Sequence, residues 1–285
     1  GCADAVVIHQ VLHFLEEPGA AVAEAARLLK PSGRLLIVDF AAHDIEEKTP
    51  GEVVTVADRE AETMIAARLR EMLPGVPVVG EEAVALDATL LDALRTEPMA
   101  WLVDPLDGTV NFANGDPHWA VMVALVREGE TVASWIHRHT DDRLYVAERG
   151  SGAWCDGLRL TCATGRSALA TLRGAVLPRF LTDEERARIV PALDRFERVS
   201  DGYTCAGYEY PAIIEGEQEF ALFQRLLPWD HAPGTLLLTE AGGVARHPDG
   251  SPLTLDPTRR GLLLASSETV WETVRATLYG SACKE

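Results

Sequence analysis

The chain has 285 residues, enough for one large domain or two smaller ones, and its 47% hydrophobic and 25% charged residues are ordinary for a soluble globular protein. Its 44 acidic and 26 basic residues give a net charge of -18, which repels nucleic-acid phosphates and anionic membrane surfaces, so we expect neither as a partner. Five cysteines without a CxxC pair argue against a disulfide framework or a structural zinc site. With no predicted signal peptide or membrane span, we expect a cytoplasmic protein.

The first forty residues predict a strand, a helix and a second strand. Residues 5–8 and 35–38 are short apolar runs typical of buried strands. Apolar residues at helical spacing predict a helix over residues 20–29, and the Lys-Pro-Ser-Gly turn at 30–33 ends it.

The next hundred residues predict a helix followed by a series of strands. A Thr-x-x-Asp capping pattern at Thr55 begins the helix, and Pro74-Gly75 ends it. Strands are then predicted at residues 76–79, 101–103, 120–126, 132–136 and 144–148. Further along, residues 182–196 predict a charged helix and residues 229–240 an apolar one.

The strongest chemical signal is the segment Asp104-Pro105-Leu106-Asp107-Gly108-Thr109, which follows an apolar strand. Pro105 fixes φ between the two carboxylates, and Gly108 lets a ligand approach the backbone closely. Carboxylate oxygens in a rigid turn suit magnesium, and a helix beginning near Thr109 would point free N–H groups at an anion. The alternative is a surface turn rich in aspartate.

Two further acidic segments stand at the ends of predicted elements. Gly80-Glu81-Glu82 follows a strand, and taken alone it is typical of a solvated turn. Asp230 begins a helix and taken alone could be its N-cap. Four carboxylates converging on one site would be unstable without cations, so these segments together favour a metal site over an acid–base pair.

Four sequence motifs resemble, in their order and spacing, those of inositol monophosphatases. The matching segments are VTVAD (54–58), GEE (80–82), WLVDPLDGTVNF (101–112) and WDHAPGTLLLTEAGG (229–243). The resemblance covers residues 41–285 and implies an α/β fold, the layered αβαβα sandwich of that superfamily, in two halves at 41–150 and 151–285. It also implies a magnesium-dependent phosphomonoesterase, a homodimer, that hydrolyses inositol monophosphate or a related sugar phosphate with a metal-activated water.

The resemblance also implies a role for individual residues. Two or three Mg²⁺ ions would be held by Glu81, Asp104, the Leu106 carbonyl, Asp107 and Asp230. Thr109, hydrogen-bonded to Asp58, resembles the pair that orients the attacking water, and Glu82 would help to position a water. The phosphate or substrate contacts would be Gly108, Thr109, Asp107 and Arg225.

The substrate stays open at this point. Histidinol-phosphate, fructose-1,6-bisphosphate and 3′-phosphoadenosine phosphatases share the same metal motifs, and we expect specificity to lie within residues 205–225. Cys205 has no basic partner nearby in the sequence and is interpreted as structural. A metal-binding but catalytically impaired fusion protein is the alternative to an enzyme.

Residues 1–40 resemble a different family. The segment from Ala3 to Phe40 is similar to the middle of a class I S-adenosylmethionine-dependent methyltransferase. The glycine-rich loop that would bind the cofactor is absent. We therefore interpret this segment as a remnant that contributes packing and binds no S-adenosylmethionine.

Overall fold

The computed structural model describes residues 3–9, 24, 27, 29–38, 45–49, 52–163 and 165–280. The chain divides into two compact units, Gly1–Ala57 and Asp58–Glu285. Among the described residues, no helix is both long enough and apolar enough to cross a lipid bilayer.

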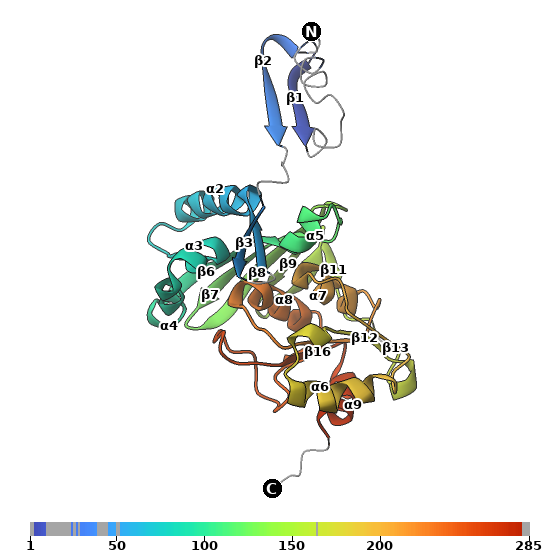
Figure 1. Ribbon diagram of the computed structural model, residues 1–285. Coiled ribbons are helices and arrows are strands. Elements are labelled where there is room, and N and C mark those ends of the chain that lie inside the picture. Colours follow the sequence, from blue (N-terminus) through green and yellow to red (C-terminus); the bar gives the residue numbers. More distant parts are fainter. Residues whose placement is uncertain are drawn as a thin grey trace. The chain divides into compact units, whose positions relative to one another are not determined.

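The first unit contains two pairs of strands (Figure 1). β1 (Ala3–His9) and β2 (Leu29–Val38) run parallel, as expected for strands joined by a crossover. β3 (Ile45–Thr49) and β4 (Glu52–Thr55) form an antiparallel pair that the sequence did not predict.

β1 and β2 confirm the two strands predicted in the first forty residues. The turn predicted at 30–33 lies inside β2, where the register of the pairing with β1 shifts. The helix predicted at 20–29 falls largely outside the described residues. Its described positions Glu24 and Arg27 are helical, but Leu29 already belongs to β2.

A long helix covers one face of the first sheet of the second unit. This helix, α2 (Val56–Met72), begins directly after Thr55, as predicted, and ends just before Pro74. Its apolar residues, Leu69 among them, pack on Trp101 and Val103 of the sheet.

The first sheet has seven strands in the order β11-β10-β9-β8-β7-β6-β5. All neighbours are antiparallel except β5 and β6, which run parallel. The buried positions of β7 alternate, because successive side chains of a strand point to opposite faces. The strands are β5 (Val78–Gly80), β6 (Met99–Asp107), β7 (Ala120–Arg127), β8 (Glu130–Arg138), β9 (Arg143–Glu148), β10 (Gly152–Cys155) and β11 (Leu158–Leu160).

Two buried helices pack against the other face of this sheet. α7 (Ala206–Ile214) is buried along its whole length, and α8 (Pro228–Glu240) along most of it. Their apolar side chains form one core with residues of both sheets, for example Met122 and Ile136 on one side and Leu264 on the other. These helices therefore form the middle layer of the unit.

The second sheet has five strands in the order β13-β12-β14-β16-β15. α6 (Asp183–Leu193) and α9 (Glu268–Tyr279) cover its outer face through a separate apolar core. The strands are β12 (Arg173–Val176), β13 (Arg198–Ser200), β14 (Phe220–Phe223), β15 (Val244–Arg246) and β16 (Leu262–Ala265). The remaining short helices are α3 (Glu81–Leu86), η3 (Ala88–Asp92), α4 (Ala93–Thr96), α5 (Thr109–Ala113), η4 (Leu169–Thr171) and η5 (Pro178–Phe180).

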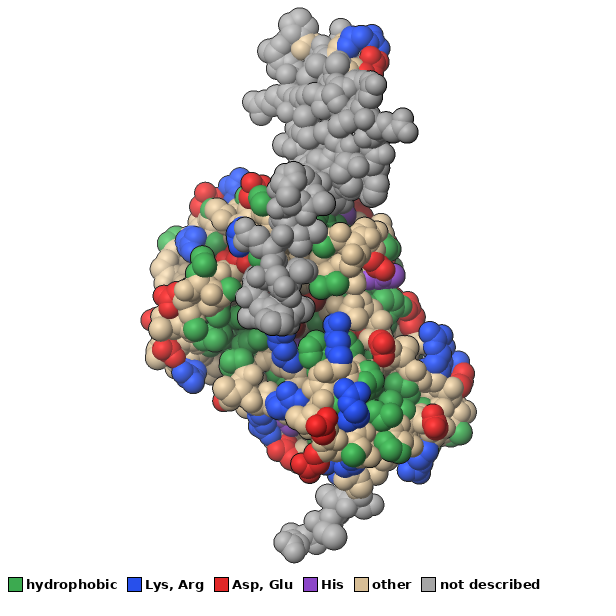
Figure 2. Space-filling view, viewed as in Figure 1, with side chains coloured by type: hydrophobic (Ala, Val, Ile, Leu, Met, Phe, Trp, Pro, Cys, Tyr) green, Lys and Arg blue, Asp and Glu red, His purple; other side chains and the backbone are tan. Residues whose placement is uncertain are grey.

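The second unit is thus a sandwich of helix, sheet, helix, sheet and helix layers, which confirms the predicted αβαβα fold (Figure 1). The first sheet ends at Leu160 and the second begins at Arg173. On the face shown in Figure 2, acidic and basic side chains are intermingled, so the negative net charge is not gathered there into one patch.

Candidate metal centre

Asp104 and Asp107 lie toward the C-terminal end of β6, the strand next to the edge strand β5. The strand continues through Asp107, so the predicted turn is instead an irregular stretch of strand. Asp104 pairs with Met122 of β7 but Asp107 pairs with Ala120, so three steps on β6 oppose two on β7. Such a bulge twists the strand and re-aims its side chains. The Asp104 carboxylate also accepts the Leu106 N–H at 2.9 Å.

Burial separates this segment from a surface turn. Asp104 is 2% exposed and Asp107 is 8% exposed. Burial raises the pKa of Asp104 well above its usual range, and the negative charges of Glu81, Asp107 and Asp230 raise it further. Burial likewise raises the pKa of Asp230, with Asp107 and Glu81 adding to the shift. The structure therefore brings these four carboxylates into one electrostatically coupled cluster, although Asp230 comes from the distant helix α8.

Glu81 and Glu82 open helix α3 and do not form a solvated turn. Glu82 is buried, and its N–H donates to a carboxylate oxygen of Glu62 at 2.7 Å. The N–H of Ala83 donates to the other Glu62 oxygen at 2.9 Å, so Glu62 of α2 caps α3 from outside. A Cβ at Gly80 would lie 2.3 Å from the Glu62 carboxylate carbon, so a larger residue would displace the carboxylate that caps α3.

Asp230 is not the N-cap of its helix. The cap position of α8 is Leu227, and Asp230 is the third helical residue, without a side-chain bond to the helix end. Its side chain instead faces the Asp104 carboxyl, within the carboxylate cluster. The positive charge of Arg225, an exposed residue just before α8, lowers the pKa of Asp230 against the effect of burial.

Thr109 and Asp58 are joined as the sequence resemblance implied. The Thr109 hydroxyl lies 3.0 Å from an Asp58 oxygen and 3.0 Å from the Leu106 carbonyl. Asp58 belongs to α2 and is 1% exposed. Gly108 precedes α5 with φ of 88°, and a Cβ there would lie 2.8 Å from the His118 carbonyl oxygen. Glycine is therefore required at this position on both conformational and steric grounds.

The sequence did not predict the groups that hold Asp107. The Gly207 N–H donates to Asp107 Oδ2 at 2.6 Å, and the Cys205 thiol lies 3.0 Å from the same oxygen. These donors lie at the N-terminus of α7, where a carboxylate is stabilised. Burial raises the pKa of Asp107 to about 6, and these bonds oppose that shift. Cys205 was interpreted as structural. The only sequence feature that could have indicated its contact with Asp107 is the run of small residues before an apolar helix.

The chemistry of this cluster fits a hard divalent cation. Its donors are carboxylate oxygens, the ligands that magnesium prefers, and without a cation burial and mutual repulsion disfavour their charged forms. No three Asp, Glu, His or Cys side chains of the described segments are already arranged as a complete metal-binding group. The assignment of individual ligands therefore remains a prediction.

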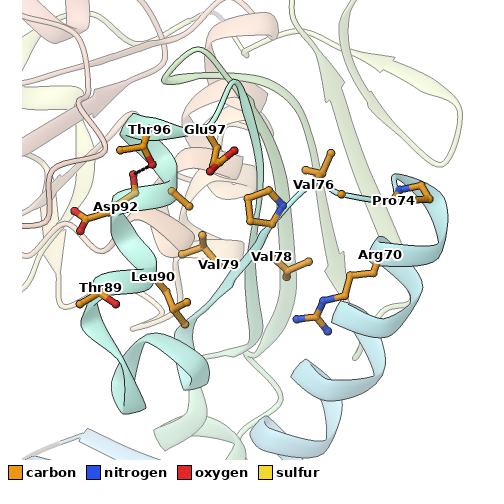
Figure 3. A pocket seen from close by; sticks show the side chains of 13 residues that line it. Arg70, Pro74, Val76, Val78, Val79, Thr89, Leu90, Asp92, Thr96 and Glu97 are labelled. Atoms are coloured by element: carbon orange, nitrogen blue, oxygen red, sulfur yellow. Dashed lines mark hydrogen bonds between the residues drawn. The ribbon is translucent and has the colours of Figure 1, made fainter.

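A separate groove lies at the edge strand β5 (Figure 3). Its volume is 680 Å³, and Arg70, Val78 and Leu90 are among the residues that line it. None of the predicted site residues contributes to this groove. The carboxylate cluster and the groove are thus different features.

The fold of the second unit matches that of a solved protein structure. A solved structure of the extragenic suppressor protein suhB from Bartonella henselae matches with a TM-score of 0.72 and 26% sequence identity, over 83% of this chain and 90% of that chain. The same layered sandwich therefore occurs in a solved relative.

Sequence comparison gives the family. The model of the inositol monophosphatase family matches residues 19–280, and the chain belongs to this family. The match begins earlier than residue 41, where the resemblance was placed from the motifs.

Two curated relatives support the same membership. An inositol-1-monophosphatase of Mesorhizobium japonicum is 33% identical over 244 residues, covering 84% of this chain and 88% of the relative. A fructose-1,6-bisphosphatase/inositol-1-monophosphatase of Thermotoga maritima is 28% identical over 229 residues, covering 76% of this chain and 81% of the relative. Membership of this family indicates a phosphatase, a hydrolase acting on small phosphorylated molecules.

Proposed function

We propose that this protein is a magnesium-dependent phosphomonoesterase that hydrolyses inositol monophosphate or a related sugar phosphate. The observation that carries the proposal is the buried cluster of Glu81, Asp104, Asp107 and Asp230. A phosphate monoester is a dianion, so it can approach four carboxylates only if cations neutralise them. The names of the two curated relatives support the choice of substrate class.

The ions would be held by these four carboxylates together with the Leu106 carbonyl. Bound there, two or three Mg²⁺ ions would neutralise the phosphate and make a bound water more acidic. Arg225 would add positive charge on the Asp230 side, since its charge lowers the pKa of that carboxyl. Glu82 lies buried beside Glu81 and would help to fix the position of a water.

Thr109 and Asp58 would orient the attacking water. When the Thr109 hydroxyl donates its proton to Asp58, the lone pairs of Thr109 Oγ1 are left to accept a hydrogen bond from water. The Asp58 carboxylate is buried in α2, so this direction is fixed by a rigid element. The N–H groups of Gly108 and Thr109 would hold the phosphate at the start of α5.

The proposal is tested by measuring phosphate release from a panel of esters with magnesium and with a chelator. The panel contains inositol 1-phosphate, fructose 1,6-bisphosphate, histidinol phosphate and 3′-phosphoadenosine 5′-phosphate. Magnesium-dependent release from inositol 1-phosphate or a sugar phosphate supports the proposal. Magnesium binding without release from any ester would favour the catalytically impaired alternative.

The Thermotoga relative gives a specific reason to include the bisphosphate, because its name combines both activities. A higher kcat/KM for fructose 1,6-bisphosphate than for inositol 1-phosphate would identify this protein as a sugar bisphosphatase with the same metal chemistry.

A further inference from the structure

Two arginines face each other at the edge of the five-stranded sheet. Arg173 of β12 is in register with Arg198 of the parallel edge strand β13. Residues paired in register project from the same face of a sheet, and like charges opposite each other are destabilising. Both arginines line a cavity of 290 Å³ that is distinct from the carboxylate cluster.

Neither arginine is fully neutralised. A terminal nitrogen of Arg173 donates to the Gly216 carbonyl at 2.8 Å and lies 3.4 Å from Glu219, which Arg166 also approaches at 3.2 Å. The Nε of Arg173 is buried and has no hydrogen-bond partner within the described part of the chain. Such an unsatisfied buried donor is unusual in a native protein.

Arg198 has still less compensation. Its side chain is exposed, and no carboxylate of the described segments forms an ion pair with it. Glu217 also lines the cavity, but its carboxylate accepts a hydrogen bond from the Tyr203 hydroxyl. Ser200 lies two residues beyond Arg198 on the same strand and adds a hydroxyl to the lining.

We propose that this cavity is a second anion site, which binds a phosphate group between Arg173 and Arg198. Planar guanidinium groups match phosphate oxygens in charge and geometry. The Ser200 hydroxyl supplies a further donor. Glu217 opposes the binding of an anion, so the site takes phosphate in the millimolar range.

The cavity is connected by a short loop to the carboxylate cluster. The loop that follows Ser200 ends at Cys205, whose thiol holds Asp107. Within it, the Tyr203 carbonyl accepts the Asn111 side chain of α5 at 2.8 Å, and the Thr204 hydroxyl donates to Asn111 at 3.0 Å. An anion bound at Ser200 is therefore linked through one loop to α5 and to Asp107. This link gives the cavity a route by which phosphate regulates the carboxylate site.

The binding test uses the full chain stripped of metal, because the uncompensated carboxylate cluster then repels phosphate. Inorganic phosphate is titrated calorimetrically into the wild type, Arg198→Gln and Arg127→Gln. Arg127 is a matched control, because it is also exposed and without an ion pair among the described residues, but it lies on β7. We expect saturable millimolar binding to the wild type and to Arg127→Gln, and a Kd at least tenfold higher for Arg198→Gln.

Conservative replacement sharpens the result, since Arg198→Lys should retain part of the affinity through its charge. A second titration with glucose 6-phosphate separates the two sources of the phosphate group. Equal affinities identify inorganic phosphate as the ligand, and tighter binding of the ester identifies a phosphorylated metabolite. Absence of saturable binding to the wild type, or equal affinity of the wild type and Arg198→Gln, would overturn the second anion site.

Discussion

The two sheets of the second unit serve the candidate site in different ways. The seven-stranded sheet and the elements next to it supply most of the charge, through Asp104 and Asp107 of β6 and Glu81 of α3. The helices packed beneath the five-stranded sheet supply one carboxylate, Asp230, and the donors at the start of α7. The first sheet and its neighbours therefore bring most of the negative charge, whereas the buried helices add one carboxylate and the donors that hold Asp107.

This difference predicts which kind of substitution should impair each of these two regions. The carboxylates of the first half depend on neutralisation, because burial and mutual repulsion raise the pKa of Asp104. The donors of α7 depend on close packing, because a Cβ at Gly207 would lie 2.5 Å from the Cβ of Ala120. Charge substitutions should therefore act on metal binding, whereas size substitutions at α7 should act on geometry.

Among these predictions, removal of one buried carboxylate should have the largest effect on activity. In Asp104→Asn we expect phosphate release to fall by about 10³-fold, because a ligand and a large part of the local charge are lost. The melting temperature of the metal-free protein should rise, since the repulsion with Glu81, Asp107 and Asp230 is relieved. A phosphate-release assay with magnesium measures the first effect, and scanning calorimetry of the metal-free protein measures the second. The exposed Asp194→Asn is the control, and a lower metal-free melting temperature for Asp104→Asn would contradict the prediction.

The water-orienting pair should respond differently from a ligand. Thr109→Ala should reduce kcat by about 10²-fold or more, because the hydroxyl that bridges to Asp58 at 3.0 Å is lost. Magnesium affinity, measured by calorimetry, should stay close to that of the wild type. Thr109→Ser keeps the hydroxyl and should recover most of the turnover. An unchanged kcat for Thr109→Ala would exclude this role.

A buried acid of the α7 layer should make stability depend on pH. Burial raises the pKa of Glu209 from 4.5 to about 7. A raised pKa means that the folded state binds the proton more tightly, so the stabilisation is complete below about pH 4.5 and is lost as the pH rises through 7. The effect is on the order of 3 kcal/mol.

Urea unfolding of the metal-free protein between pH 5 and 8 measures this loss. Glu209→Gln cannot titrate and should show a shallower decline, with the remaining slope due in part to Asp107, whose pKa is raised to about 6. Equal slopes for the wild type and Glu209→Gln would show that Glu209 is charged throughout this range.

Lithium tests the proposed cation positions at the carboxylates without any change of sequence. Lithium prefers oxygen ligands and carries less charge than magnesium, so it should occupy one cation position and retain the product phosphate. By analogy with the family, we expect uncompetitive or mixed inhibition in the millimolar range. Steady-state kinetics at several magnesium concentrations test this. Activity indifferent to lithium would separate this protein from the inositol-phosphatase branch.

Deletion of residues 1–40 should have the smallest effect on chemistry, because every proposed ligand lies beyond Asp58. Thermal stability or solubility should fall, but activity per folded molecule should change by less than tenfold, or about 1.4 kcal/mol in the barrier. Calorimetry of the full chain should detect no binding of S-adenosylmethionine. Micromolar binding, or loss of metal binding in a truncated chain that remains folded by circular dichroism, would contradict the interpretation of this segment as a remnant.

The sequence predicted side chains of the site better than its backbone. The four carboxylates and the Thr109–Asp58 hydrogen bond could be proposed because their residue types stand in recognisable segments. The layers of the fold were predicted through the resemblance to inositol monophosphatases, because the strand and helix patterns alone do not say how the elements stack. The turn predicted after Asp104 is a bulged stretch of β6, and the turn predicted at 30–33 lies inside β2. Both predictions were wrong because a bulge depends on a partner strand that local sequence does not reveal.

Tertiary contacts were the other gap. Glu62 caps α3 from α2, and Gly207 donates to Asp107 through its main chain, so neither residue carries a local motif. Cys205 could not be interpreted from its neighbours in the sequence, because its partner is Asp107 of β6. The Arg173–Arg198 pair was missed for a similar reason, since it exists only once β12 and β13 are placed side by side.

The hold of α7 on Asp107 has a consequence for the choice of ion. The Gly207 N–H and the Cys205 thiol both bond to Oδ2, so that oxygen is already engaged by the protein. Calcium commonly binds carboxylates through both oxygens and has six to eight ligands. Magnesium is usually bound through one oxygen of each carboxylate and keeps several waters. If Asp107 is a ligand as proposed, the donors at the start of α7 disfavour coordination through both of its oxygens, which favours magnesium over calcium.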